Sequence, residues 1–521
     1  MSDSTAPEFS GWRSFFWPIH GHELRKLLPM LLILFLITFN YNVLRTMKDT
    51  LVVATGKQSG AEVIPFIKLW IMFPGSVLLT YVFTKLCNRL SREMVFYTMM
   101  SVFLLYFVFF IFVLYPWREV VHPHEFADRL QLLLPAGMKG FVAMIRNWSF
   151  STFYVMAELW GNIVLFLLFW GFANQVTHLG EAKRFYAILG IGTNISGMIA
   201  GQIAVYISRT GMISFIPYGS RPWDQQMLIL VSIVVVCGVA SMAVFRWMHT
   251  QVLERDKAEA DKLSQGEVKG KMSMRENFSY LFKSRYLIFL AVVTIAYNII
   301  INLVEVLWKY QVHELYPNPS EYNLYMNQVM VIIGALATCT SFLGTGNLIR
   351  RCGWTMTAML TPIILLVTSI AFFGLFFAKE YFPIYAQGLI GTSPLALIVF
   401  FGTLQNVLSR GAKYTIYDAT KEVAFIPLSQ ECKIKGKAAI DGVCNRLGKS
   451  GGSAIHQVLL ISFSSLSLSA PYVAGFLLAV IGIWMGAVSS LGKQFDSLTS
   501  GEQETAAATP ATSEAEPLLQ G

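Results

Sequence analysis

The sequence predicts an all-α protein that crosses a membrane with twelve helices. Of its 521 residues, 55% are hydrophobic and only 14% are charged, which is about half the charged fraction of ordinary soluble domains. Apolar runs of about 20 residues, each long enough to cross a bilayer, recur along nearly the whole chain. These two observations exclude a soluble globular protein. The net charge of +9 lies mostly in short segments between apolar runs, where it orients a membrane protein rather than binding nucleic acid.

The candidate spans are apolar runs bounded by charged residues or proline. The segment 409–439 between two of them is polar and is expected to be partly helical inside the protein. The twelve predicted spans cover residues 28–47, 64–84, 95–115, 148–172, 185–207, 227–248, 287–308, 327–348, 355–378, 389–408, 440–465 and 470–491.

The short loops predict the orientation, because lysine and arginine accumulate on the cytoplasmic side of a membrane protein. Their basic residues all fall on one side if the N-terminus is cytoplasmic, and an even number of spans returns the C-terminus to that side. The opposite side carries 116–147, a longer loop with a possible surface helix. Since the N-terminus resembles neither a cleavable signal nor a transit peptide, we expect a multi-pass protein of a bacterial inner membrane. The orienting residues are Arg25, Lys26, Lys85, Arg89, Arg92, Lys183, Arg184, Arg350 and Arg351.

The two halves of the chain look related. Tyr297-Asn298 follows Tyr41-Asn42 by 256 residues, and Gly448 follows Gly192 by the same distance. A duplication with an even number of spans per half gives parallel halves, as in the major-facilitator architecture. The predicted organisation is a cytoplasmic segment 1–26, a six-helix bundle 27–248, a cytoplasmic linker 249–285, a second six-helix bundle 286–492 and a disordered cytoplasmic tail 493–521.

Four charged residues lie within the apolar runs: Lys68, Glu158, Glu305 and Lys449. A charge near the bilayer centre is costly and usually faces a cavity or a partner. Snorkelling to the interface is the alternative for Lys68, which is one turn from its helix start. Two acids and two lysines spread over both halves favour a polar cavity between them.

Further polar residues could extend this cavity. Arginine and lysine would suit a polyanion such as phosphate, although cations near span ends often serve as interfacial anchors, and asparagines often join helices. No catalytic constellation, metal-ligand spacing or cofactor motif occurs in the sequence, so we expect a transporter rather than an enzyme. The additional candidates are Arg45, Lys48, Arg146, Arg410, Lys413, Tyr154, Asn194 and Asn298.

Several long segments resemble the ATP/ADP translocases of plastids and obligate intracellular bacteria. Together they run from about residue 16 to residue 492. They are FNYNVLRTMKDTLVV, GAEVIPFIKLW, FYVMAELWGNIVLFLLFWGFANQVT, EAKRFYAILGIGTNISG, NLVEVLWK, GAKYTIYDATKEVAFIPL and KGKAAIDGVCNRLGKSGG.

This resemblance implies exchange of external ATP for internal ADP, with phosphate accompanying ADP in bacterial members, by a protein that we expect to be a monomer in the lipid bilayer. The motifs carry the family's functional charges onto Lys68, Glu158 and Glu305, and its eleventh-span lysine onto Lys449 or Lys437. The first span reads LRTMKDT where the family pattern has a further acid. Other nucleotides such as GTP, UTP or NAD, or proton coupling through a glutamate, are therefore the alternatives; a membrane enzyme or a non-transporting receptor is a more distant one.

Overall fold

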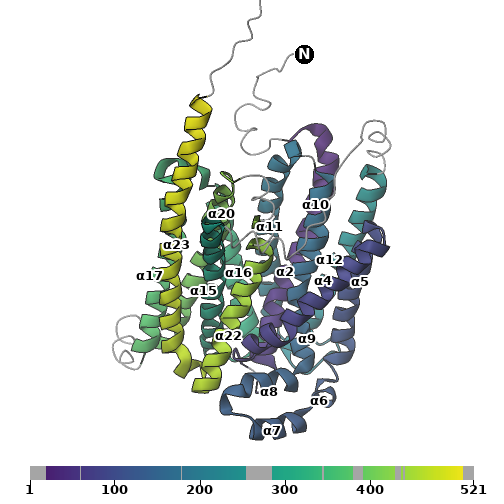
Figure 1. The fold of residues 1–521 in the computed structure, drawn as a ribbon. Helices are drawn as coiled ribbons and strands as arrows, with labels where there is room; N and C mark the ends of the chain where they lie inside the picture. The colour runs from purple at the N-terminus through teal and green to yellow at the C-terminus, as the bar shows by residue number, and fades with distance from the viewer. Residues whose placement is uncertain are drawn as a thin grey trace, which may run out of the picture.

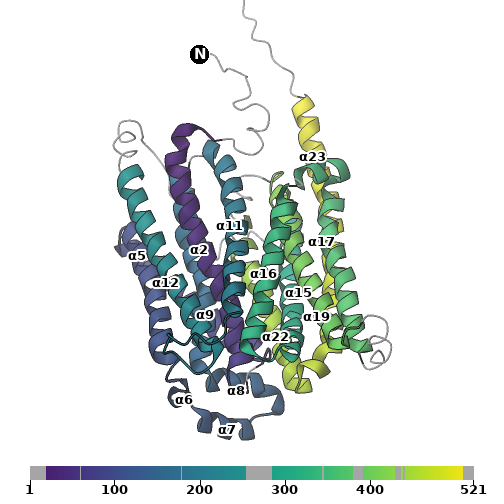
Figure 2. The ribbon, with the colours of Figure 1, turned by 180° about the vertical axis from the view of Figure 1, so that it is seen from behind.

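The computed structural model describes residues 19–58, 60–177, 179–253, 284–342, 345–379, 391–428, 436–437 and 440–508. These residues form two helical bundles that stand side by side (Figures 1 and 2), and no strand occurs among them. Ten of the described helices are long and apolar enough to cross a membrane. The predicted class, an all-α membrane protein, is confirmed.

The first bundle contains α2 (Leu24–Thr50) with η2 (Leu51–Thr55), α3 (Val63–Phe66), η3 (Ile67–Met72), α4 (Phe73–Arg89), α5 (Arg92–Phe109) with η4 (Phe110–Leu114), α9 (Trp148–Leu159), η6 (Trp160–Trp170), α10 (Gly171–Val176), α11 (Leu179–Ser208) and α12 (Pro222–Met248) with η7 (His249–Leu253). The second contains α15 (Arg285–Leu315), α16 (Pro319–Phe342), α17 (Thr345–Ala378), α19 (Pro394–Ala412), η8 (Lys413–Tyr417), α20 (Asp418–Ala424), η9 (Ile440–Cys444), α22 (Asn445–Phe463) and α23 (Leu466–Ala508). A helix lies at each of the twelve predicted spans.

Two predicted spans, now α16 and α22, are helical but do not belong to the ten strongly apolar ones. Both lie where the bundles meet: α16 packs on α11, and α22 packs on α3. Helices that face the other bundle are shielded from lipid and tolerate polar residues, which explains their lower hydropathy.

The segments outside the apolar spans agree only in part with the sequence prediction. The polar segment after α19 continues as helix through η8 and α20 to Ala424, as expected. The last helix, α23, extends to Ala508, so the first part of the predicted disordered tail is helical. Most of the predicted linker, residues 254–283, lies outside the described residues. In α17, Gly353 has φ 78° and ψ 165°, a conformation that glycine adopts readily, and it separates a short helical segment from the long helix that follows.

The two bundles repeat one packing pattern. In the first, α2 packs on α11 and α12; in the second, α15 packs on α22 and α23. Glycine permits both close crossings. A Cβ on Gly197 would lie 3.3 Å from Asn42 Nδ2, and one on Gly448 would lie 2.6 Å from the Cβ of Asn298. The pairing of these helices, though not the position of the two glycines, agrees with the duplication that the 256-residue offset predicts.

The ends of the molecule differ. The start of α2 and the end of α23 lie together at the top of Figure 1. Short helices cross the opposite end, mainly beneath the first bundle: α6 (Arg118–Val121), α7 (His124–Leu133), η5 (Ala136–Met138) and α8 (Lys139–Arg146). A Cβ on Gly137 of η5 would overlap the Leu460 carbonyl of α22, so this segment touches the second bundle. We call this the cap end and the other the terminal end.

Candidate functional site

Charged side chains from both bundles meet in the space between them. They come from α2, η3 and α9 of the first bundle and from α15, α19, η8 and α22 of the second. Lys68 lies on π-helical η3, Lys413 and Tyr414 lie on η8, and Glu158 lies just before η6. Such π-helical segments are frequent at functional sites because the wider turn redirects side chains.

Five of these residues form one continuous chain of ion pairs. Lys48 Nζ lies 3.0 Å from Glu158 Oε1 and 2.9 Å from Asp49 Oδ1. Lys309 Nζ lies 2.8 Å from Asp49 Oδ2 and 3.0 Å from Glu305 Oε1. The chain Glu158–Lys48–Asp49–Lys309–Glu305 thus crosses from one bundle to the other through Asp49.

Glu305 forms ion pairs with three cationic side chains. Besides Lys309, Arg410 Nη2 lies 3.0 Å from Glu305 Oε1, and Lys68 Nζ lies 3.9 Å from Glu305 Oε2. A buried carboxylate with several cationic partners stays ionised, because the nearby positive charges favour its charged form. Glu305 therefore holds cations from α15, α19 and η3 together.

Asn302 connects two of the predicted lysines. Its side-chain oxygen accepts a 2.9 Å hydrogen bond from Lys68 Nζ. Its amide nitrogen donates to the Lys449 backbone carbonyl at 2.6 Å and to Ser453 Oγ at 2.8 Å. Asn302 thereby joins η3 of the first bundle to α22 of the second, and it places Lys68 near the segment that carries Lys449.

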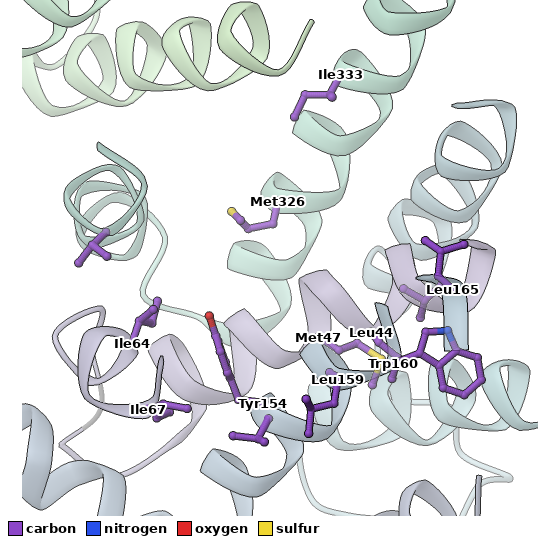
Figure 3. Close-up of a cluster of buried hydrophobic side chains, with 14 of the residues drawn as sticks. Leu44, Met47, Ile64, Ile67, Tyr154, Leu159, Trp160, Leu165, Met326 and Ile333 are labelled. Carbon is purple, nitrogen blue, oxygen red and sulfur yellow. The ribbon is translucent and has the colours of Figure 1, made fainter. Parts of the chain in front are cut away.

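Tyr154 lies beneath Lys48. The Lys48 Nζ is 3.9 Å from the centre of the Tyr154 ring, a distance typical of a cation–π interaction. The ring is fully buried in the apolar cluster that Figure 3 shows, near Ile67 and Leu159. In this conformation Tyr154 supports Lys48 and has no free face for a nucleotide base.

Side chains nearer the terminal end retain exposed surface. Lys449 is exposed and Tyr414 is 45% exposed. Lys449 lies near enough to Glu158 for electrostatic attraction and near enough to Lys413 and Arg45 for repulsion. A small cavity of about 10 Å³, room for about one water molecule, separates Arg45 from Arg410 across the interface. The buried ion pairs therefore lie at the inner end of an accessible, positively charged region.

Other predicted residues have different surroundings. Arg146 on α8 pairs with Asp128 at 2.6 Å, within the cap-end segment, and does not join the ion-pair chain. Asn298 hydrogen-bonds to Asn445 at 2.8 Å, so it joins α15 to α22. Asn194 lies half-buried on α11, where its carbonyl faces Gly334 of α16. Lys437, the alternative to Lys449, pairs with Glu422 and is 47% exposed.

Lys413 lies beside the accessible region rather than in the buried chain. Its Nζ is 3.3 Å from Asp418 Oδ2 and 4.7 Å from the centre of the Tyr414 ring. Lysine here can swing toward an anion, because about a third of its side chain is exposed.

The sequence prediction missed Asp49 and Lys309, and it offered Lys48 as a cavity residue with interfacial anchoring as the alternative. All three lie near span ends, where charges are common and carry little information. Two signals could have found them. Glu305 follows Asp49 by the repeat offset of 256 residues, and Lys309 follows Glu305 by four residues, a spacing that brings both side chains to one helix face.

The balance of charge suits a polyanion. Seven cations face four carboxylates, so the region carries an excess of three positive charges. The cations are Arg45, Lys48, Lys68, Lys309, Arg410, Lys413 and Lys449, and the carboxylates are Asp49, Glu158, Glu305 and Asp418.

Comparison with known proteins decides the family. The sequence model described as "TLC ATP/ADP transporter" matches residues 2–495. The chain belongs to the TLC ATP/ADP transporter family. It is 44% identical to ADP,ATP carrier protein 1 of Chlamydia muridarum, with 100% of both chains covered. It is 41% identical to the chloroplastic ADP,ATP carrier protein 1 of Arabidopsis thaliana, over 92% of this chain and 75% of that one.

Solved structures support the fold alone. A bacterial homologue of the iron transporter ferroportin, in an inward-facing state, matches with a TM-score of 0.54 and 14% identity over 91% of this chain and 100% of that one. The D-xylose–proton symporter matches with a TM-score of 0.52 and 13% identity over 88% and 97%. Together with the family, these likenesses confirm the predicted major-facilitator-like class. This TLC family member is an ATP/ADP exchange transporter and not an enzyme.

Proposed function

We propose that the chain imports ATP across a bacterial inner membrane in exchange for internal ADP, by alternating access of one central site. The excess of positive charge between the bundles carries this proposal, because ATP and ADP bring three or four negative charges. Both termini would lie in the cytoplasm. In support, the start of α2 and the end of α23 share the terminal end with Lys26, Arg184 and Arg350.

The phosphates would enter from the accessible side and contact Lys449, Lys413 and Arg45 first. Lys68, Lys48 and Arg410 would follow deeper in the site. The base would lie against the exposed Tyr414 ring. Glu158 would either accept a hydrogen bond from the adenine amino group or orient the nearby cationic side chains. Inorganic phosphate would use the same cations when it accompanies ADP, and a single chain provides the whole site.

Proton coupling with another nucleotide is the second candidate. It needs a carboxylate that alternates between charged and neutral forms. Glu158 contacts Lys48, and Glu305 contacts both Lys309 and Arg410, so both glutamates have partners that favour the ionised form. This disfavours proton carriage by either glutamate while the ion pairs persist.

The test is counter-exchange in liposomes. We expect labelled ATP to enter vesicles loaded with ADP, to enter less with GTP, UTP or NAD inside, and to be insensitive to an uncoupler. Lys449→Ala should lower exchange by about 100-fold, the effect of removing one partner from a desolvated charged contact. Lys437→Ala tests the alternative assignment, and because this exposed lysine already pairs with Glu422 we expect it to exchange at the wild-type rate. Wild-type exchange in Lys449→Ala would refute the assignment of Lys449.

A further inference from the structure

Asp49 is the carboxylate through which the two bundles hold each other. It is only 2% exposed, and each of its oxygens contacts a lysine from a different bundle. Oδ1 lies 2.9 Å from Lys48 Nζ of the same helix, and Oδ2 lies 2.8 Å from Lys309 Nζ of α15. A carboxylate buried this deeply needs such partners, because desolvation of an unpaired charge is costly.

Both lysines are shared with glutamates on the accessible side. Lys48 also contacts Glu158, and Lys309 also contacts Glu305. These glutamate side chains are 20% and 14% exposed, whereas the two lysines and Asp49 are 2–3% exposed. By exposure the two glutamates thus lie outside the lysines and Asp49, while Asp49 also lines the small cavity beside Arg45, Glu305 and Arg410.

Neutral hydrogen bonds between the bundles flank Asp49. Thr46, one turn before it, donates to Asn327 Oδ1 at 3.0 Å, and Thr50 donates to Asn323 Oδ1 at 3.2 Å. Both asparagines lie on α16 of the second bundle. Asp49 is thus the charged centre of a seam of contacts at the cap end.

We propose that Asp49 is the gate of the cap end and that the nucleotide opens this gate by competing for its two lysines. Phosphate oxygens replace Glu158 and Glu305 as partners of Lys48 and Lys309 and draw both lysines toward the cavity. Asp49 then loses its partners, and it regains solvation only when the bundles separate at the cap end. An empty carrier keeps the Asp49 pairs and stays closed, which makes transport an exchange.

This inference rests on the proposed function and is tested with Asp49→Asn in liposomes loaded with labelled ADP. The variant keeps the shape of the side chain, and each lysine keeps one glutamate, so the fold should survive. We expect net ADP efflux without external nucleotide to rise about tenfold, because loss of an ion pair that only the closed state contains shifts the closed–open equilibrium. Exchange with external ATP should stay within about fivefold of wild type.

The matched control is Asp441→Asn, which removes a lysine pair of similar length, 2.7 Å to Lys421, within the second bundle. It should leave efflux unchanged. If net ADP efflux in Asp49→Asn equals that of wild type, the gate proposal is wrong. It is also wrong if the variant loses exchange without any rise in efflux, because Asp49 would then be a binding residue. Absence of exchange in the wild-type chain would instead refute the proposed function.

A second measurement does not depend on replacing Asp49. In a background with the six native cysteines changed to serine, Thr50→Cys with Asn323→Cys places two thiols across the seam. We expect oxidation to block exchange reversibly, and saturating ADP to slow disulfide formation by about fivefold, since the bound nucleotide favours the open seam. Cross-linking that ADP leaves unchanged would overturn the proposal that the nucleotide opens this end.

Discussion

The two ends of the interface between the bundles are built differently. At the cap end, the bundles bind each other directly: Asp49 pairs with Lys309, and Gln457 of α22 accepts a hydrogen bond from Trp70 and donates one to the Pro65 carbonyl. At the terminal end, described ion pairs join helices of one bundle. Lys26 pairs with Glu181, Arg184 with Glu23, Lys421 with Asp441 and Lys437 with Glu422.

This difference shows which end is closed. Contacts that span the interface must break when the carrier changes conformation, whereas contacts within a bundle can persist through a rigid rocking motion. The polar bonds at the cap end are therefore properties of one state, and those at the terminal end are properties of each bundle. If the terminal end is cytoplasmic, as proposed above, this conformation is closed at the outer side and faces inward.

The largest effect should follow from Lys309→Met. This change leaves Asp49 and Glu305 short of a buried cation, and breaking a buried pair costs about 3–5 kcal/mol. We expect ATP/ADP exchange to fall by about 100-fold and the melting temperature in detergent to drop. Combining it with Asp49→Asn should recover most of the melting temperature. Additive losses in the double variant would mean that the two residues act separately.

The cap end should also be sensitive to acid. Burial lowers the pKa of His122 to about 4, and its Nε2 lies 2.6 Å from Ser149 Oγ. Because the unfolded histidine titrates near pH 6.5, only the unfolded chain binds this proton between the two values. Stability present above pH 6.5 is therefore lost as pH falls toward 4, by up to about 3 kcal/mol.

The measurement is the melting temperature across this pH range for wild type and for His122→Gln, which cannot titrate. The variant should lose less stability on acidification. Parallel pH profiles would show that His122 contributes nothing to the acid sensitivity.

A smaller effect should follow from Asn323→Ala. This removes the seam hydrogen bonds to Thr50 and to Ser208 Oγ at 2.8 Å, at a cost of about 1–2 kcal/mol. Net ADP efflux from loaded liposomes should rise about threefold, less than with Asp49→Asn, since no charge is removed. If net ADP efflux were larger in Asn323→Ala than in Asp49→Asn, the neutral hydrogen bonds rather than the Asp49 ion pairs would hold the cap end closed.

The smallest effect should come from the terminal end. Lys26→Ala removes a partly exposed pair to Glu181 within one bundle, and such pairs contribute about 0–1 kcal/mol. We expect exchange and efflux within about twofold of wild type. A strong leak in Lys26→Ala would erase the distinction between the two ends.

The sequence predicted the membrane class and the position of every described span, because apolar runs and charged boundaries report directly on the bilayer. It also predicted α16 and α22, which are less apolar because they face the other bundle. The helical extension of α23 to Ala508 was not predicted, since alanine- and glutamate-rich sequence is compatible with both helix and disorder.

Prediction of the site was more uneven. Glu158 and Glu305 were conspicuous because apolar residues surround them in sequence. Asp49 and Lys309 lie near span ends, so only the repeat offset could have marked them. A uniformly apolar sequence pattern does not show which face of a helix points inward. The burial of Tyr154 therefore could not be predicted from the sequence. That the predicted residues bind nucleotide is still a prediction.

The sharing of Lys48 and Lys309 between carboxylates also bears on turnover. A nucleotide gains its contacts with these lysines only by displacing glutamates already in place, so part of the attraction is offset at the moment of binding. Weaker net affinity means faster dissociation, because affinity differences are expressed mainly in dissociation rates. A carrier has to release one nucleotide before it accepts the next. Glu158 and Glu305 would speed this release, because they pair with Lys48 and Lys309 again as the nucleotide leaves.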